Sequence, residues 1–222
     1  MPRKWARTEL NEHVFDAPLS PEAQYWVGFL MADGSVGFTG PNAGHIVLAL
    51  QERDRGHVEA FRRFLGSTHA IYARAPAPAP GGYTSTGLAQ LKVESADLVR
   101  ALERYGVVPG KSRRTRVLGL EQSRDFWRGV VDGDGSVGVQ VTGRSKGVPW
   151  LALAGSPGLL EQFVHFVHRE EPDSTQVPSI RPNGLAVLTY RGPMACRILR
   201  RLYAGAAVAL PRKLEAARSA CR

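Results

Sequence analysis

The chain has 222 residues with 43% hydrophobic content, enough to bury the core of one sizeable domain or of two half-size domains. Its 29 basic residues against 20 acidic ones give a formal net charge of +9, which indicates a polyanionic partner such as nucleic acid. No run of 18 apolar residues occurs, and the amino terminus lacks the apolar stretch of a signal peptide. We therefore expect a soluble protein without a membrane partner, retained in the cell.

Cysteine usage and residue bias bear on the cellular setting. Cys196 and Cys221 form neither a CxxC pair nor a disulfide framework, which indicates a reducing, intracellular environment. Only five of the 29 basic residues are Lys, whereas Ala, Gly, Pro and Arg abound. This bias is typical of GC-rich coding, so we predict a cytoplasmic or nucleoid protein of a GC-rich bacterium or its phage.

The first half of the chain contains four helix or arm signals and four strand signals. Residues 1–19 are polar and basic, and Pro18 blocks a continuous helix, so we expect an N-terminal arm. Ser20, Pro21 and Glu22 supply an N-cap, a first-turn proline and an acidic first turn, which predicts a helix over 21–32. The periodicity then predicts strands over 36–39 and 46–51, a helix over 55–65, strands over 69–75 and 88–94, and a helix over 95–105 capped by Ser95.

The second half repeats that order. After a cap at Ser123 it predicts a helix, strands over 137–142 and 150–154, a helix over 159–167, strands over 177–181 and 185–190, and a helix over 193–203. Asp134 follows Asp33 by 101 residues, and Lys213 follows Lys111 by 102. We therefore predict an α+β fold: a tandem αββαββα repeat with a pseudo-twofold axis, in which two antiparallel four-stranded sheets form a saddle. The predicted domains are the arm 1–19 and the halves 20–115 and 116–222.

One nonapeptide occurs twice, as WVGFLMADG at 26–34 and as WRGVVDGDG at 127–135. Small residues four apart share one helical face and let two helix backbones pack closely. They are Gly28 and Ala32 in the first copy, and Gly129 and Gly133 in the second. Such packing would bring Asp33 and Asp134 together at one end of the helix pair, where two carboxylates favour a divalent cation. An isolated Asp-Gly would more often only end a helix, but the duplication favours a metal site.

These nonapeptides resemble the LAGLIDADG signature of homing endonucleases, and the resemblance extends over residues 20–216. It implies a monomeric, site-specific endonuclease of the intron-homing type that cuts double-stranded DNA. The implied cofactor is Mg²⁺, with Mn²⁺ as a substitute and Ca²⁺ supporting binding without cleavage. In that family the acidic residue at the eighth motif position is a metal ligand, which maps onto Asp33 and Asp134. Lys111 and Lys213 stand where the family has a basic residue that assists at the scissile phosphate; the alternative for each is a solvated lysine.

The sixth motif position differs between the copies, with Met31 in the first and Asp132 in the second. We interpret Asp132 as a helix-end or polar contact rather than a ligand. An EF-hand loop starting there is excluded, because its required glycine and bidentate glutamate are replaced by Val137 and Gly143.

The end of the second strand carries a further candidate. Gln51 or Glu52 stands where the family often has a polar residue that organises active-site water. The counterpart in the repeat lies around Ala154 and Gly155, which offer no polar side chain. We therefore expect either two chemically unequal sites or a one-residue slip in this alignment of the halves.

Sequence recognition would fall to the strands, because a two-stranded ribbon fits the major groove and directs every second side chain at base edges. The candidates are Thr39, Gln51, Tyr72, Arg74, Gln90 and Lys92 in the first half, and Gln140, Thr142, Arg144, Trp150, Arg181 and Thr189 in the second. Arg113, Arg114 and Arg116, between the halves, better suit phosphate contact. Because the halves carry different residues, the predicted DNA site is long and only loosely palindromic.

Two alternatives keep this fold and lack the cleavage reaction. One is an RNA-splicing maturase, and the other is a catalytically silent DNA-binding regulator. Retention of both aspartates favours catalysis, because a protein that only binds has no need of two carboxylates beside a phosphate.

Overall fold

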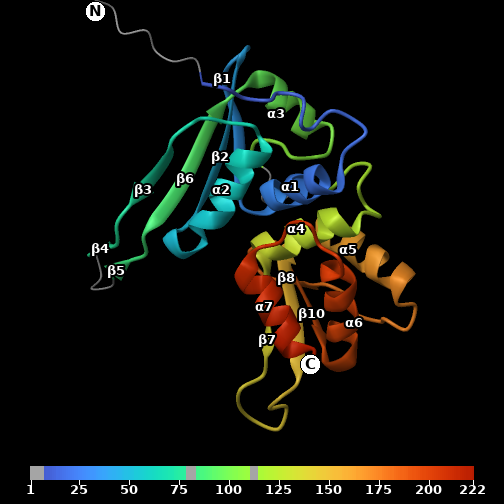
Figure 1. Ribbon diagram of the computed structural model, residues 1–222. Helices are drawn as coiled ribbons and strands as arrows, with labels where there is room; N and C mark the ends of the chain where they lie inside the picture. The colour runs from blue at the N-terminus through green and yellow to red at the C-terminus, as the bar shows by residue number, and fades with distance from the viewer. Residues whose placement is uncertain (1–7, 79–83, 111–114) are drawn as a thin grey trace, which may run out of the picture.

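The computed structural model describes residues 8–78, 84–110 and 115–222, which form two α+β halves that meet along a pair of helices (Figure 1). The elements of the first half are α1 (Pro21–Ala32), β1 (Gly34–Gly40), β2 (Ala43–Gln51), the 3₁₀ turn η1 (Glu52–Asp54), α2 (Arg55–Phe64), β3 (Ile71–Arg74), β4 (Ala77–Pro78), β5 (Thr84–Ser85), β6 (Leu88–Glu94) and α3 (Ala96–Glu103). Those of the second half are α4 (Arg124–Asp134), β7 (Gly135–Val139), β8 (Pro149–Gly155), α5 (Pro157–Glu170), β9 (Ser179–Ile180), β10 (Ala186–Arg191), α6 (Gly192–Tyr203) and α7 (Pro211–Ala220).

Each half contains an antiparallel four-stranded sheet with the same strand order. The order is β1-β2-β6-β3 in the first half and β7-β8-β10-β9 in the second, and β4 pairs with β5 in a short ribbon at the tip of the first sheet. The helices cover one face of each sheet and leave the other face open (Figure 1). This architecture confirms the predicted α+β fold with tandem αββαββα halves, and α7 is an addition to it.

Serine caps begin the helices where the sequence predicts them. The hydroxyl oxygens of Ser20, Ser95 and Ser123 accept hydrogen bonds from backbone amides three residues later, at 3.1, 3.1 and 3.0 Å. Ser156 caps α5 in the same way at 3.2 Å. Each cap satisfies an amide that the first helical turn leaves without a partner, and so it sets the starting residue.

Alternation along the strands places the core between each sheet and its helices. In β2, Ile46, Leu48 and Leu50 are buried, while the residues between them are half-buried on the opposite face. Aromatic side chains fill equivalent places in the two halves: Trp26 packs on Phe61, and Trp127 packs on Phe163. Burial of large apolar rings at matched positions explains why both halves keep the same helix-on-sheet arrangement.

The carboxyl-terminal segment departs from the prediction. Residues 211–220 form α7, which folds back beside α6, and Cys221 then forms a disulfide with Cys196, with the two Cα atoms 5.3 Å apart. The expectation that these cysteines do not pair is therefore wrong, and it no longer supports a reducing environment. Two cysteines 25 residues apart meet only because helices α6 and α7 lie antiparallel. Within the described ranges, no helix is long and apolar enough to cross a membrane.

Candidate nuclease site and nucleic-acid interface

Helices α1 and α4 pack with their backbones in contact at the centre of the molecule. A methyl group added to Gly28 would overlap the carbonyl oxygen of Phe126, and one added to Gly129 would overlap that of Tyr25. At the end of the pair, a side-chain carbon on Gly133 would overlap Cβ of Ala32. The small residues of the two motifs thus occupy the places where the helices approach most closely.

Asp33 and Asp134 lie at the ends of these helices. Asp33 is the C-cap of α1, Asp134 is the last residue of α4, and both are exposed. Because Gly133 lies against Ala32 and next to the Asp33 amide, the two helix ends are side by side. The pseudo-twofold arrangement therefore presents both aspartates at the same end of the helix pair.

A glycine follows each aspartate and begins the next strand. Added side chains at Gly34 and Gly135 would overlap backbone atoms of Leu30 and Val131, respectively, one turn earlier in the helix. No side chain fits where the chain turns from helix to strand, which explains the Asp-Gly pair in both motifs.

The residues at this place fit a hard divalent cation. The acidic residues there are Asp33 and Asp134, and among the described residues no group of three or more His, Cys, Asp or Glu side chains could hold a metal ion by itself. Mg²⁺ is commonly held by one or two carboxylates together with water and substrate phosphate oxygens. Two exposed carboxylates beside helix C-terminal carbonyls meet that requirement.

A hollow of about 230 Å³ adjoins Asp134. Met31 and Ala32 of α1 form one part of its wall, and Thr115 and Ser156 contribute to the rest. Both Thr115 and Ser156 are buried, and the Ser156 hydroxyl donates to the Thr115 carbonyl at 2.5 Å. The space beside Asp134 is therefore bounded by residues that are themselves held in place.

Lys213 lies at the start of α7 and reaches the end of α4. Its ammonium group is buried and donates to the carbonyl oxygens of Val131 at 3.1 Å, Asp132 at 3.2 Å and Gly135. Burial lowers the pKa of this lysine. All three N–H groups are used by backbone carbonyls, so Lys213 stabilises the carboxyl-terminal end of α4. Lys111, its predicted counterpart, falls outside the described residues.

Asp132 is completely buried and accepts hydrogen bonds from three groups. The donors are the Tyr203 hydroxyl at 2.5 Å, the Leu210 amide at 2.6 Å and the Tyr25 hydroxyl at 2.8 Å. Burial raises the pKa of its carboxyl group, and the hydrogen bonds oppose that shift. As expected from its sequence position, Asp132 makes polar contacts inside the protein and is not placed to bind a metal ion.

The hydrogen-bonded chain continues from Tyr25 to His57 of α2. The Tyr25 hydroxyl oxygen and His57 Nε2 lie 2.9 Å apart. Because the single hydroxyl hydrogen of Tyr25 is donated to Asp132, the His57 Nε2–H donates to the Tyr25 oxygen. Burial, as the largest cause, lowers the pKa of His57 to about 4, while nearby Asp54 opposes the shift. Sequence analysis missed Tyr25, His57 and Tyr203, because isolated polar rings within apolar helical faces read as ordinary core residues.

A second contact joins the two halves nearby. Arg212 Nε of α7 donates to both carboxylate oxygens of Asp54, at 2.9 and 3.1 Å. Asp54 is buried, whereas the Arg212 side chain is 41% exposed. This ion pair also escaped sequence analysis, because its partners are 158 residues apart.

Gln51 ends β2, Glu52 begins the turn η1, and both are exposed. Glu52 forms an ion pair with Arg55 at 3.3 Å. Gly34 pairs with Leu48 and Gly135 with Leu153, so the residue three places further along is Gln51 in one half and Ser156 in the other. The counterpart of Gln51 is therefore Ser156, rather than Ala154 or Gly155, and its hydroxyl is occupied in capping α5.

Most first-half candidates for DNA contact share the open face of the sheet. Strand register places Tyr72 beside Gln90 and Arg74 beside Leu88, whose other neighbour is Gln51. Lys92 lies on the same face and forms an ion pair with Glu94 at 2.9 Å. Thr39 lies near the β1–β2 turn, where its hydroxyl donates to the Ala43 carbonyl.

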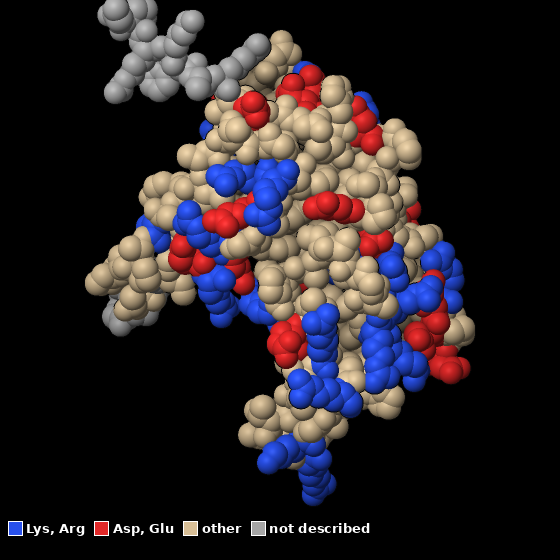
Figure 2. Space-filling model, in the orientation of Figure 1, with Lys and Arg blue, Asp and Glu red and all other residues tan. Residues whose placement is uncertain are grey.

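The second-half candidates are spread more widely. Trp150 and Thr189 lie on the open face of β8 and β10, and Gln140 follows β7. Thr142 and Arg144 lie in the β7–β8 loop, and Arg181 lies in the β9–β10 turn; all three are exposed. Figure 2 shows the surface hollowed between this β7–β8 loop and the β4–β5 tip, as the predicted saddle requires.

An equivalent aromatic ring lies on the open face of each sheet. The ring of His45 covers Gly37 of β1, and the ring of Trp150 covers Gly138 of β7. His45 was not among the sequence candidates, because the importance of its place depends on the glycine opposite. Two planar side chains thus occupy matched positions on the two open faces.

The linker candidates are placed only in part. Arg113 and Arg114 lie outside the described residues. Arg116 is exposed and donates to Glu161 at 3.1 Å, so its guanidinium already has a carboxylate partner.

Solved structures share this architecture. The LAGLIDADG homing endonuclease I-GzeII, in complex with its DNA target, is 12% identical and has a TM-score of 0.59 over 88% of this chain and 87% of that chain. The LAGLIDADG meganuclease I-AabMI, bound to uncleaved DNA, is 10% identical and has a TM-score of 0.57 over 91% and 89%. This chain has the LAGLIDADG homing endonuclease fold. The resemblance of the two nonapeptides is therefore confirmed at the level of the fold.

A third similar structure was determined in the presence of a divalent cation. I-SmaMI bound to an uncleaved DNA target in the presence of calcium ions is 11% identical and has a TM-score of 0.55 over 91% of this chain and 90% of that chain. The sequence matches no protein-family model, and no curated protein is significantly similar to it. The shared fold is therefore visible in the structure and not in overall sequence similarity.

Proposed function

We propose that the protein is a monomeric, site-specific DNA endonuclease that hydrolyses phosphodiester bonds with a divalent metal ion, Mg²⁺ in the first place. The observation that carries the proposal is the presence of two exposed aspartates at adjacent ends of a closely packed helix pair. Open antiparallel sheets flank that place on both sides. Two solved proteins of this fold, the homing endonuclease I-GzeII and the meganuclease I-AabMI, are bound to DNA, and the net charge of +9 favours a polyanionic partner.

In this proposal Asp33 and Asp134 hold the metal ions. Ions bound there would activate water and neutralise charge at the scissile phosphate. The open sheet faces would lie in the major groove on either side of the cleavage point, with side chains such as Tyr72, Gln90 and Trp150 directed at base edges. The cut then falls where the two halves meet, and each half reads one side of a long site.

Lys213 enters the proposal as a positioning residue. Its contacts hold the last turn of α4 and the first residue of β7, between which Asp134 projects. Lys111 remains a predicted assisting residue of the first half, and Gln51 remains a predicted organiser of water beside Asp33.

The test is incubation of the purified protein with a randomised duplex library in Mg²⁺ or in Ca²⁺, followed by sequencing of the cut ends. We expect cleavage at one long motif in Mg²⁺ and binding without cleavage in Ca²⁺. Asp33→Asn and Asp134→Asn should abolish cleavage and retain binding, whereas Asp173→Asn, an exposed aspartate in the loop after α5, should cut as the wild type does.

Each contrary outcome has a definite meaning. Cleavage by both aspartate variants at the wild-type rate would reject the assignment of the site. Salt-sensitive duplex binding without cleavage in Mg²⁺ or Mn²⁺ would identify a DNA-binding regulator, and a preference for structured RNA would identify a maturase.

A further inference from the structure

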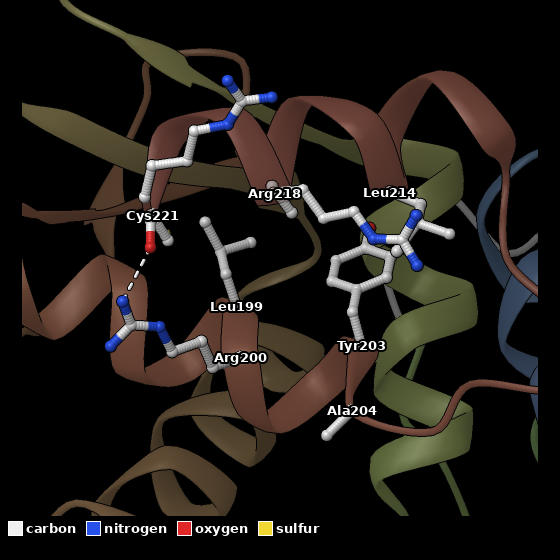
Figure 3. A pocket seen from close by; sticks show the side chains of 9 residues that line it. Leu199, Arg200, Tyr203, Ala204, Leu214, Arg218 and Cys221 are labelled. Carbon is white, nitrogen blue, oxygen red and sulfur yellow. Dashed lines mark hydrogen bonds between the residues drawn. The ribbon is translucent and has the colours of Figure 1, made fainter.

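A cavity of about 390 Å³ lies between α6 and α7 (Figure 3). Its apolar wall consists of Leu199 and Tyr203 from α6 together with Leu214 and Ala217 from α7. These two helices pack on the covered side of the second sheet, so the cavity is on the side opposite the open face. It is therefore separate from the candidate nuclease site and from the proposed DNA-binding face.

Three arginines line this cavity: Arg200 of α6, Arg218 of α7, and Arg222, which follows α7. The side chains of Arg200 and Arg218 are exposed and border it from α6 and α7, respectively (Figure 3). Arg200 donates one N–H to the carbonyl oxygen of Cys221 at 2.6 Å. Within the described part of the chain neither Arg200 nor Arg218 forms an ion pair, whereas Arg197 and Arg201 of α6 pair with Glu171 and Glu170.

The arginines of α6 therefore differ in whether a carboxylate neutralises them. Acidic side chains neutralise Arg197 and Arg201 of α6, whereas Arg200 and Arg218 retain guanidinium donors for a further acceptor. Figure 2 shows Lys and Arg side chains gathered over α6 and α7. An apolar wall with arginine guanidinium groups at its rim is complementary to a ligand that has an apolar body and an anionic head group.

We propose that this cavity binds a small organic anion, with its hydrocarbon or aromatic body against Leu199, Tyr203, Leu214 and Ala217. Its carboxylate or phosphate group would lie at the rim, beside the guanidinium of either Arg200 or Arg218, which Figure 3 shows at opposite ends of the cavity. The volume is within the range of small-molecule sites, about 300–1,000 Å³. This binding function is independent of DNA cleavage.

Two structural features prepare the cavity for a ligand. The Cys196–Cys221 disulfide fastens the end of α7 to α6, which holds the two walls together. The hydroxyl of Tyr203 is directed away from the cavity to Asp132, which fixes the orientation of its ring. A site whose walls are already held loses less conformational entropy when it binds.

The first test compares head groups on the wild-type protein at low salt, by calorimetry and by thermal unfolding. Octanoate and octyl phosphate should bind and raise the Tm, because a ligand that binds only the folded state stabilises it. Octylamine and octanol, with the same apolar body, should bind at least about tenfold more weakly. Equal affinity for all four compounds, or no binding of either anion, would overturn the proposal.

The second test locates the site. Either Arg200→Gln or Arg218→Gln, whichever removes the partner of the head group, should weaken octanoate binding by about tenfold. Arg197→Gln is the matched control, since it removes the same charge from α6 but lies outside the cavity, and it should bind as the wild type does. If the rim variants bind octanoate as Arg197→Gln does, the anion is bound elsewhere and the proposed site is wrong.

Discussion

The ends of α1 and α4 come from the same repeated motif, but different contacts hold them in place. At the sixth motif position, Met31 of α1 is buried and apolar, whereas Asp132 of α4 is buried and accepts three hydrogen bonds. The Leu210 amide and the Lys213 ammonium then anchor the start of α7 to the end of α4. Duplication thus accounts for the matched positions of the two aspartates. In the second half, polar contacts of Asp132 also attach α7 to the end of α4.

The contacts that position the two aspartates differ from the polar contacts that attach one half to the other. Close backbone packing at Gly28 and Gly129 is common to both motifs and brings the helix ends together. The network through Asp132 belongs to one half and joins it to α1 and α2 of the other through Tyr25 and His57. Changes at the shared contacts should therefore be more damaging than changes in the attachment.

The largest effect is expected at the helix contact. Gly129→Ala places a methyl group on the carbonyl oxygen of Tyr25, and backbone atoms move less easily than side chains, so we expect a loss of about 3 kcal/mol or more in the free energy of unfolding. Urea unfolding measures it. Gly56→Ala on α2 is the control, because nothing lies within 4 Å of its added carbon, and it should be neutral or stabilising by up to about 1 kcal/mol. Equal midpoints for the two variants would contradict the close contact.

Substituting Leu at both sixth motif positions, Met31 and Asp132, tests how much the polar network of the second half contributes to stability. Met31→Leu conserves volume and should cost less than about 1.5 kcal/mol. Asp132→Leu leaves the Leu210 amide and two tyrosine hydroxyls without their acceptor, so we expect a loss of about 2–3 kcal/mol. Asp132→Asn can still accept from Tyr25 and Leu210 while donating to Tyr203, and it should recover most of that loss. Equal unfolding free energies for the two Leu variants would show that the network contributes little.

The pH dependence tests the extension of this network into α2. In the folded protein the pKa of His57 is about 4, below the ordinary value of 6.5, so the unfolded chain binds a proton that the folded protein does not. Stability should therefore fall as the pH drops below about 6.5, by about 2 kcal/mol between pH 7 and pH 5. His57→Gln should lose less over the same interval in urea titrations. Parallel pH profiles for both proteins would mean that His57 is readily protonated in the fold.

The smallest effect is expected at the ion pair between the halves. Arg212→Gln leaves the buried Asp54 carboxylate without its cation, but the Arg212 side chain is partly exposed, so we expect a loss of about 1 kcal/mol. Arg116→Gln removes an ion pair in which both side chains are more than half exposed and should change stability by less than about 0.5 kcal/mol. A double-mutant cycle with Asp54→Asn gives the coupling directly, and a coupling near zero would remove this contact from the attachment of α7.

Local chemistry accounts for the parts of the structure that sequence analysis predicted. Ser20, Ser95 and Ser123 cap helices because their side chains reach amides three residues away, and strand alternation follows from the pleat. The alignment of the second half slipped from Ser156 to Ala154 and Gly155, because only strand pairing shows that Ser156 corresponds to Gln51. Lys213 was placed near the correct aspartate, but the direction of its ammonium group depends on α7, which the local pattern did not reveal.

By itself, the sequence determined the repeat, the order of helices and strands, and the two Asp-Gly ends, because each depends on neighbours within a few residues or on one fixed offset. Only the tertiary structure decided the Cys196–Cys221 disulfide, the Asp54–Arg212 ion pair and the burial of Asp132 beneath two tyrosines. Those contacts join residues 25 to 158 positions apart, and their partners are chosen by how the helices pack rather than by any pattern along the chain.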